Sequence, residues 1–164
     1  MLDRAGAVSF RPATPADDTF LSEVYASTRR EELAAVGFPP EVEASFLRQQ
    51  HETQARSYPL QFPGAEQFVV FEAGVPVGRT WVWRTEAEIL LADIALLPEH
   101  RGRGTGTAVL RALQREAAAR GVALRLHVSE GDRVAAWYRR LGFATVERHP
   151  AYEEMVWRAV AEGV

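Results

Sequence analysis

The sequence predicts a mixed α/β fold, in which a central mixed sheet of about seven strands is combined with four helices. Three observations support it: β-favouring runs occur near both ends and in the middle, four segments have helical periodicity, and the second half alternates strand, helix, strand, helix. That alternation needs a crossover between parallel neighbours, whereas tight turns elsewhere predict hairpins. The expected order is β-α-α-β-β-β-α-β-α-β-β.

The first third of the chain is expected to hold one strand and two helices. Val8 to Arg11 is typical of a short strand, and Thr14 to Asp17 marks a helix start, because Thr caps a helix and Pro fits its first turn. We expect a loop from Arg29 to Pro40, which ends in Gly-Phe-Pro-Pro. A second helix of weaker periodicity should then span Glu41 to Tyr58.

The middle of the chain predicts a hairpin followed by a buried strand. The apolar run Phe68 to Phe71 and the run Val77 to Trp83 flank the turn residues Ala73 to Pro76. We expect Trp81 and Trp83, on one face of their strand, to pack in the core. Ile89 to Leu97 is too apolar for an edge strand and should lie inside the sheet.

The last third predicts two more helices and three more strands. A helix from Thr105 to Arg120 ends at a glycine, and Val122 to Val128 alternates apolar and polar residues as a strand does. The helix around Val134 to Leu141 is followed by Phe143 to Glu147 and Tyr152 to Arg158, which should form the final antiparallel pair.

Composition bounds the class of protein. The 164 residues suggest one domain over residues 1–164, with its core over about residues 8–158. The chain has no cysteine, no membrane-length apolar run and no apolar leader segment, so we expect a soluble, cytoplasmic protein. All 19 basic residues are arginine, which fits a GC-biased coding sequence, and the net charge of -3 argues against a nucleic-acid-coating surface.

The sharpest chemical signal is the glycine-rich segment from Pro98 to Thr107, which lies between a buried strand and an amphipathic helix. Glycines at positions 102, 104 and 106 let successive backbone N–H groups converge, and the helix start adds partial positive charge. This arrangement predicts a pyrophosphate cradle. A nucleotide-triphosphatase P-loop is excluded because the chain has no lysine, and the dinucleotide-binding pattern fails at its third glycine.

These motifs resemble the GNAT superfamily of acyl-CoA-dependent N-acyltransferases. The resemblance is carried by Arg101-x-x-Gly104-x-Gly106 after a buried strand, and by the later run from Trp137 to Phe143, which contains Tyr-x-x-Leu-Gly-Phe. It implies a GNAT-type fold in which two parallel strands, here Ile89 to Leu97 and Val122 to Val128, splay apart and bind CoA between them.

The resemblance further implies acetyl-CoA as a co-substrate and no metal. The pantetheine arm would lie beside the strand, where a backbone N–H near Leu96 would face the thioester carbonyl, and the pyrophosphate would lie on the loop. Asp132 is expected to cap a helix first and to contact the cofactor second, since an aspartate accepts but cannot donate. The expected cofactor-binding residues are Ile94, Ala95, Leu96, Arg101, Gly102, Arg103, Gly104, Thr105, Gly106, Thr107, Asp132 and Tyr138.

Direct attack on a thioester needs a neutral amine, and an alkylammonium with a pKa near 10.4 is less than ~0.1% neutral at pH 7. Asp93 and His127 are therefore candidate bases, with Glu88 third, although each also fits an ordinary structural role. By resemblance, Tyr138 would be the acid that protonates the departing thiolate, although its spacing also fits a core stripe.

The sequence thus predicts an N-acetyltransferase that acts on a primary amine of a small molecule or peptide. A non-catalytic acyl-CoA-binding module of the same fold is the main alternative, and a nucleotide-dependent oxidoreductase is a remote one. We expect neither a nucleic acid nor a membrane as partner. The acceptor, the acyl-chain preference and the oligomeric state, monomer or homodimer, stay open at this point.

Overall fold

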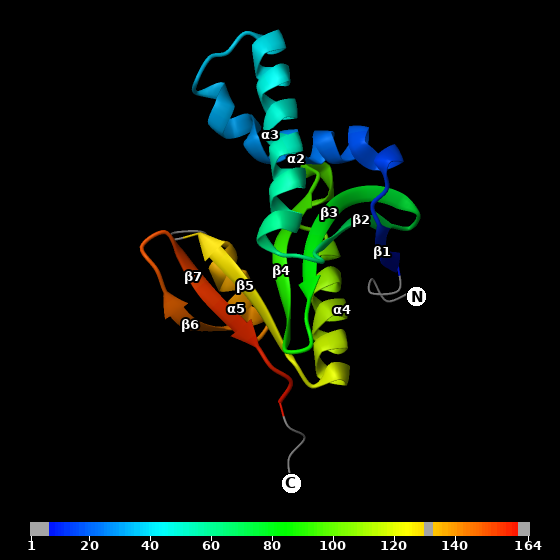
Figure 1. The fold of residues 1–164 in the computed structure, drawn as a ribbon, viewed down its shortest axis with the longest axis vertical. Coiled ribbons are helices and arrows are strands. Elements are labelled where there is room, and N and C mark those ends of the chain that lie inside the picture. The colour runs from blue at the N-terminus through cyan, green and yellow to red at the C-terminus, as the bar shows by residue number, and fades with distance from the viewer. Residues whose placement is uncertain (1–6, 130–132, 161–164) are drawn as a thin grey trace.

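The computed structural model describes residues 7–129 and 133–160 and forms a seven-stranded sheet with the order β1-β2-β3-β4-β5-β7-β6 (Figure 1). The strands are β1 (Val8–Pro12), β2 (Glu66–Glu72), β3 (Val75–Arg84), β4 (Glu88–Leu96), β5 (Ala123–Ser129), β6 (Ala144–Arg148) and β7 (Tyr152–Trp157). The helices of more than one turn are α2 (Asp18–Ala34), α3 (Pro40–Gln61), α4 (Thr105–Arg120) and α5 (Val134–Arg140). The predicted fold class and element order are confirmed.

The predicted loop from Arg29 to Pro40 is wrong over its first half, because α2 continues to Ala34. The polar residues of this stretch support the helix locally: Arg29 pairs with Glu32 one turn later, and Thr28 donates to the carbonyl of Tyr25. Helix α3 also extends beyond its predicted end at Tyr58 and ends at Gln61, with Pro59 in its last turn.

The hairpin between β2 and β3 is confirmed. Its turn lies at Ala73 and Gly74, whose φ values of 49° and 80° are the left-handed pair that a two-residue hairpin favours. Strands β3 and β4 are also antiparallel, with a register shift between Trp81 and Val82. Strand β4 is therefore interior, as its apolar sequence predicts.

The two faces of the sheet are covered by different helices. Helices α4 and α5 pack on one face through an apolar cluster that includes Ile89 and Leu91 of β4. Helix α2 covers the other face, where Val24 packs against Ala95, and the end of α3 packs there through Tyr58 and Phe62, which contact Trp81 and Trp83. Helices α2 and α3 cross the end of the sheet away from the C-terminus (Figure 1).

Trp81 is buried in the core as predicted, whereas Trp83 stays half-buried and donates its indole N–H to the carbonyl of Pro63 at 2.8 Å. None of the helices in the described ranges combines the length and apolar character that a membrane crossing requires.

Candidate active site

The parallel pairing between β4 and β5 ends in the middle of the sheet. It runs from Glu88 opposite Ala123 to Leu91 opposite Leu126 and stops there. Beyond this point β5 continues on its other side with β7, and β4 continues with β3. The strands therefore part as the resemblance implies, and a segment of β4 loses its neighbour on one side.

A β-bulge accompanies the separation. Trp81 and Val82 of β3 lie opposite Asp93 and Leu91, so Ala92 has no partner in this register. Because of this extra residue, Leu91 and Ile94 both pack into the cluster under α4, although they are three positions apart. Asp93 consequently points to the opposite face of the sheet, the face that α2 and α3 cover.

The backbone of β4 presents polar groups to the gap. The N–H of Leu97 donates to Val77 at 2.9 Å, and the carbonyl of Asp93 accepts from Thr80 at 2.9 Å, so residues of odd number face β3. Backbone direction alternates along a strand, and the N–H and C=O groups of Ile94 and Leu96 therefore face the open side. The carbonyl of Leu96 accepts from Nε of Arg101 at 2.9 Å, whereas its N–H stays directed into the gap.

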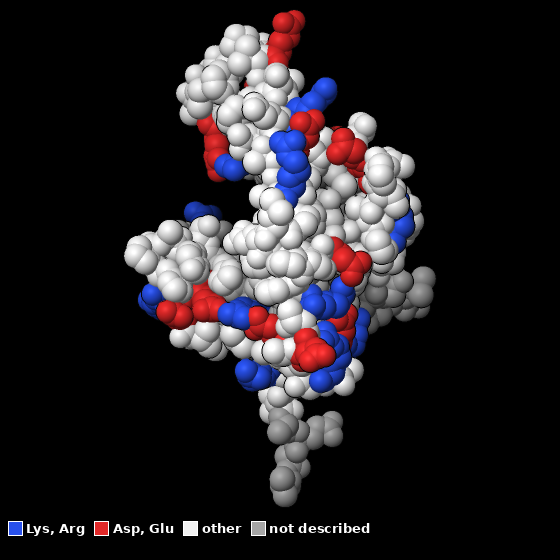
Figure 2. Space-filling view, in the orientation of Figure 1, with Lys and Arg blue, Asp and Glu red and all other residues white. Residues whose placement is uncertain are grey.

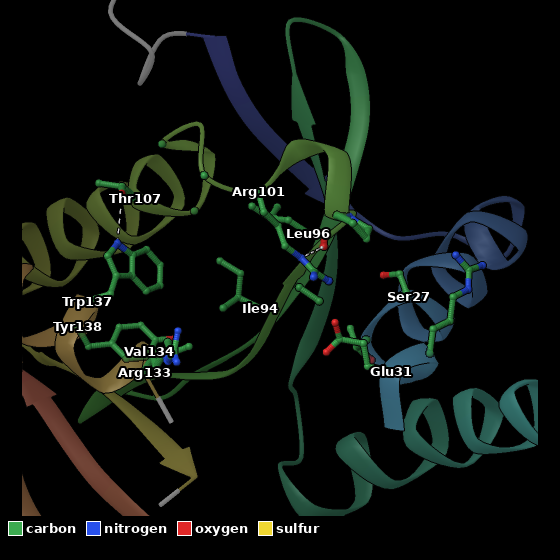
Figure 3. A pocket seen from close by; sticks show the side chains of 17 residues that line it. Ser27, Glu31, Ile94, Leu96, Arg101, Thr107, Arg133, Val134, Trp137 and Tyr138 are labelled. Atoms are coloured by element: carbon green, nitrogen blue, oxygen red, sulfur yellow. Dashed lines mark hydrogen bonds between the residues drawn. The ribbon is translucent and has the colours of Figure 1, made fainter. Parts of the chain in front are cut away.

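The glycine-rich loop adopts the geometry that its sequence predicts. Gly102 and Gly104 have left-handed φ values of 73° and 83°, and Gly104 is the residue from which α4 starts. Gly106 lies in the first turn against Trp137, where a Cβ would come within 3.3 Å of Cη2. Trp137 in turn donates from Nε1 to Oγ1 of Thr107 at 3.1 Å (Figure 3). The start of α4 thus presents its free N–H groups beside the opened strand.

A cavity of about 1030 Å³ joins the loop, the open edge of β4 and two helices (Figure 3). Its size lies at the upper end of the range for small-molecule sites. In the space-filling view the surface is also hollowed between the α2–α3 pair and the strands β5, β7 and β6 (Figure 2). The lining residues are Ser27, Thr28, Arg30, Glu31, Ile94, Ala95, Leu96, Pro98, Arg101, Gly102, Gly104, Gly106, Thr107, Arg133, Val134, Trp137 and Tyr138.

Most of the expected cofactor-binding residues meet at this cavity, but the side chains of two do not, and a third residue lies outside the described part of the chain. The side chain of Thr105 is buried and donates from Oγ1 to Glu72 at 2.8 Å, so only its backbone can face a ligand. Arg103 is exposed and is absent from the lining. Asp132 lies outside the described residues, so neither of its expected roles can be placed. The residues that do line the cavity are Ile94, Ala95, Leu96, Arg101, Gly102, Gly104, Gly106, Thr107 and Tyr138.

Tyr138 lies both in the apolar core and at the wall of the cavity. Its side chain is 6% exposed and packs against Trp137 and Phe143 within the main apolar cluster. It also lines the cavity, on the side opposite α2 (Figure 3). The tyrosine is therefore held rigidly at the wall of the site.

Asp93 lies on the α2–α3 face, where it forms a 3.0 Å ion pair with Arg79. Arg79 is only 2% exposed, and its guanidinium lies over the ring of Tyr25. Burial raises the pKa of Asp93 above its ordinary value, although the Arg79 charge acts in the opposite direction. Burial and the Asp93 charge raise the pKa of Tyr58 to about 12, so that phenol stays protonated.

His127 and Glu88 lie on the same sheet face but have different partners. His127 is exposed, lies 3.8 Å from Glu154, and contacts Tyr152 edge-on. Glu88 is paired with Arg125, which also binds Glu154. Neither Asp93 nor His127 is among the residues that line the cavity, although Asp93 directly precedes the lining residue Ile94, and an arginine neutralises Glu88.

Glu147, His149 and Glu154 are close enough to offer ligand atoms within 4.8 Å of one another. Arg125 already binds Glu154, and a guanidinium there opposes a cation. We therefore assign no metal chemistry to this group.

One wall of the cavity includes residues that were not predicted as site residues. Ser27, Thr28 and Arg133 were not considered, and Arg30 and Glu31 lie in the segment that was expected to be a loop. A helical reading of residues 27–31 would have placed Ser27 and Glu31 one turn apart on one face.

The sequence and structure were compared with known proteins. Residues 63–145 match the family model described as an acetyltransferase (GNAT) domain. A mycothiol acetyltransferase of Nocardiopsis dassonvillei is 32% identical over 111 residues, which cover 67% of this chain and 31% of that protein. The chain thus matches about a third of the length of that curated relative.

Solved structures share the fold. The PaiA N-acetyltransferase of Thermoplasma acidophilum, solved in complex with coenzyme A, has a TM-score of 0.69 at 16% identity, covering 93% of this chain and 99% of that one. An acetyltransferase from Thermus thermophilus has a TM-score of 0.66 at 22% identity, covering 93% and 97%.

The loop geometry predicts that Gly104→Asp weakens coenzyme A binding by at least about tenfold. The variant forces a side chain into a left-handed position and sets a carboxylate beside the pyrophosphate, and like charges about 4 Å apart repel by a few kcal/mol near a surface. Isothermal titration calorimetry measures the affinity. Gly121→Asp is the matched control, because Gly121 has a φ of 69° at the other end of α4. Equal affinity in both variants would contradict the assignment.

Proposed function

Since the chain belongs to the GNAT family of acetyltransferases, we propose that it transfers the acetyl group of acetyl-CoA to a primary amine by direct attack in a ternary complex. The observation that carries this proposal is the shared cavity, in which the opened edge of β4 meets the glycine-rich start of α4. An extended ligand with amides at one end and phosphates at the other satisfies both parts.

The residues of the chain supply binding and orientation for this reaction. Backbone groups of Ile94 and Leu96 can pair with the pantetheine amides, while the N–H groups of α4 and the guanidinium of Arg101 face the pyrophosphate. The free N–H of Leu96 then serves as the hydrogen-bond donor to the thioester oxygen, where negative charge develops. The amine nitrogen attacks the carbonyl carbon, the C–S bond breaks, and the thiolate takes up a proton.

Asp93 is the base that we favour. Its raised pKa brings its proton affinity closer to that needed at neutral pH, and it lies three residues before Leu96 on the strand that holds the thioester. It faces the α2–α3 side, from which an acceptor can approach without crossing the core under α4. A water molecule can carry the proton over the remaining gap. His127 is the alternative, since it is exposed on the same face.

A second candidate function follows from the same geometry. A module that binds acyl-CoA without reacting would keep the cradle and the opened strand, and the ion pair with Arg79 that partly neutralises Asp93 favours this reading.

Release of free thiol separates these functions. The protein is mixed with acetyl-CoA and a panel of primary amines, and the thiol is followed with a colorimetric reagent. We expect saturable thiol release that depends on the amine, with acetylated amine detected in equal amount by mass spectrometry. Saturable binding of coenzyme A with no such release would establish the binding module instead.

The raised pKa of Asp93 predicts a distinctive pH profile for kcat/KM. The carboxylate must be unprotonated to act, so activity falls as pH drops through its folded-state pKa, which lies above the ordinary value. Asp93→Asn should lower kcat/KM about hundredfold and remove this acidic limb, leaving only the ionisation of the amine. His127→Gln is made in parallel. Loss of the limb in His127→Gln alone would transfer the role to His127.

For Tyr138→Phe we expect kcat to fall about tenfold or more while the affinity for coenzyme A changes less than twofold. Phenylalanine preserves the packing against Trp137 and Phe143 but removes the hydroxyl that protonates the thiolate. Some activity should remain, because the thiolate of a thiol with a pKa near 8.5 is a good leaving group even when it is not protonated as it departs. Steady-state kinetics and calorimetry measure the two quantities, and an unchanged kcat would leave Tyr138 as a core residue.

A further inference from the structure

Four consecutive charged residues of α2, from Arg29 to Glu32, lie in two different environments. Arg29 and Glu32 pair with each other at 3.0 Å and lie outside the cavity lining. Arg30 and Glu31 belong to the lining, together with Ser27 one turn before Glu31. In Figure 3 the Glu31 carboxylate projects from α2 toward the side where Arg101 and the edge of β4 lie.

Glu31 is the only acidic residue among the described residues that line the cavity. Within the described part of the chain, the charged lining residues are Arg30, Arg101, Arg133 and Glu31. The three arginines suit a cofactor that carries phosphates, whereas a carboxylate repels them. Glu31 also makes no hydrogen bond or ion pair with the described residues, unlike its neighbour Glu32. Glu31 is exposed at the cavity, where an anionic cofactor gives no reason for a carboxylate, whereas a cationic group of the acceptor would pair with it.

The reacting nitrogen is a poor candidate for that cation. A carboxylate beside an ammonium stabilises the protonated form and raises its pKa, by one unit for each 1.36 kcal/mol of interaction. Attack on the thioester needs the neutral form, so a strong contact between Glu31 and the nucleophile would oppose the reaction. Glu31 fits a positive charge that does not react.

We propose that Glu31 binds a second ammonium group of the acceptor, so that the enzyme selects diamines over amines with an uncharged tail. This inference rests on the proposed acetyl transfer. One nitrogen of the acceptor, in its neutral form, attacks the thioester carbon at the edge of β4, and the C–S bond breaks as the amide bond forms. That nitrogen loses one proton to the base, and the departing thiolate takes up one proton and leaves as the free thiol of coenzyme A. The other nitrogen stays protonated against Glu31 on α2 and is released unchanged with the product.

Three acceptors of similar length test the proposal: 1,5-diaminopentane, n-pentylamine and 5-aminopentanoate, whose tails are cationic, uncharged and anionic. We expect kcat/KM to be about tenfold higher for the diamine than for n-pentylamine, and lowest for 5-aminopentanoate. The preference for the diamine should shrink between about 20 and 500 mM NaCl, since salt screens an exposed charge pair.

Glu31→Gln and Glu32→Gln form a matched pair on adjacent positions of one helix. In Glu31→Gln the ratio of kcat/KM for the diamine to that for n-pentylamine should fall about tenfold, mainly through KM, because the lost contact is made equally in the ground and transition states. In Glu32→Gln the ratio should stay within twofold. Glu31→Arg should invert the order and favour 5-aminopentanoate.

The outcomes separate the proposal from its premise. A preference for the diamine that survives Glu31→Gln, or a preference of the native protein for either other acceptor, overturns the role of Glu31 while leaving acetyl transfer intact. An equal loss with all acceptors, together with weaker coenzyme A binding by calorimetry, assigns Glu31 to the cofactor and also overturns the proposal. Absence of thiol release with every amine refutes the proposed function itself.

Discussion

The parting of β4 from β5 after Leu91 and Leu126 is the constraint on which the site depends. Backbone N–H and C=O groups removed from a ladder must find other partners or lose free energy. Each strand keeps its outer neighbour, β7 for β5 and β3 for β4, whereas the inner edges that face each other beyond Leu91 and Leu126 have no strand partner. The sheet therefore carries an incomplete ladder at its centre, which the proposed amide-bearing ligand would complete. The start of α4 lies beside that edge because the chain leaves β4 directly into the glycine-rich loop.

The bulge next to this edge determines which residues of β4 face each side of the sheet. By adding one residue at Ala92, it lets Leu91 and Ile94 share the α4 face while Asp93 turns to the α2–α3 face. In the proposed reaction, the cofactor would lie beside Ile94 on one side of this strand and the base Asp93 on the other. Arg79 fixes the second side: it is buried, paired with Asp93 and stacked on Tyr25, while its Nε and Nη1 find no acceptor among the described residues. The Arg79 charge opposes the effect of burial on the pKa of Asp93, so the carboxylate stays charged more readily than burial alone would allow.

Elements that depend on local sequence signals could be predicted from the sequence. The Ala73–Gly74 turn, the alternation of β5 and the glycines before α4 each determine their own backbone, so the element order and the cradle could be predicted. The failures concern long-range contacts. The bulge opposite Trp81 leaves no mark in the pattern of β4, and the burial of Thr105 follows from Glu72, more than thirty residues away. The second half of α2 was misread because its polar run lacks an apolar stripe, although the Arg29–Glu32 pair supports it as a helix. That error placed Arg30 and Glu31 in a loop instead of on a helix that lines the cavity.

The absence of lysine has a consequence for a site of this kind. A neutral lysine amine near an acyl thioester competes with the acceptor, and acetylation would then remove the positive charge that the phosphates need. Arginine avoids both effects, because its guanidinium stays protonated at any physiological pH and is not a nucleophile there. The cations beside the cavity, Arg30, Arg101 and Arg133, therefore hold their charge throughout turnover. Whatever coding bias produced this composition, the cations that line the cavity keep a constant charge over the physiological pH range, so in the proposed reaction the pH dependence of the rate would come from other groups, such as the acceptor and Asp93.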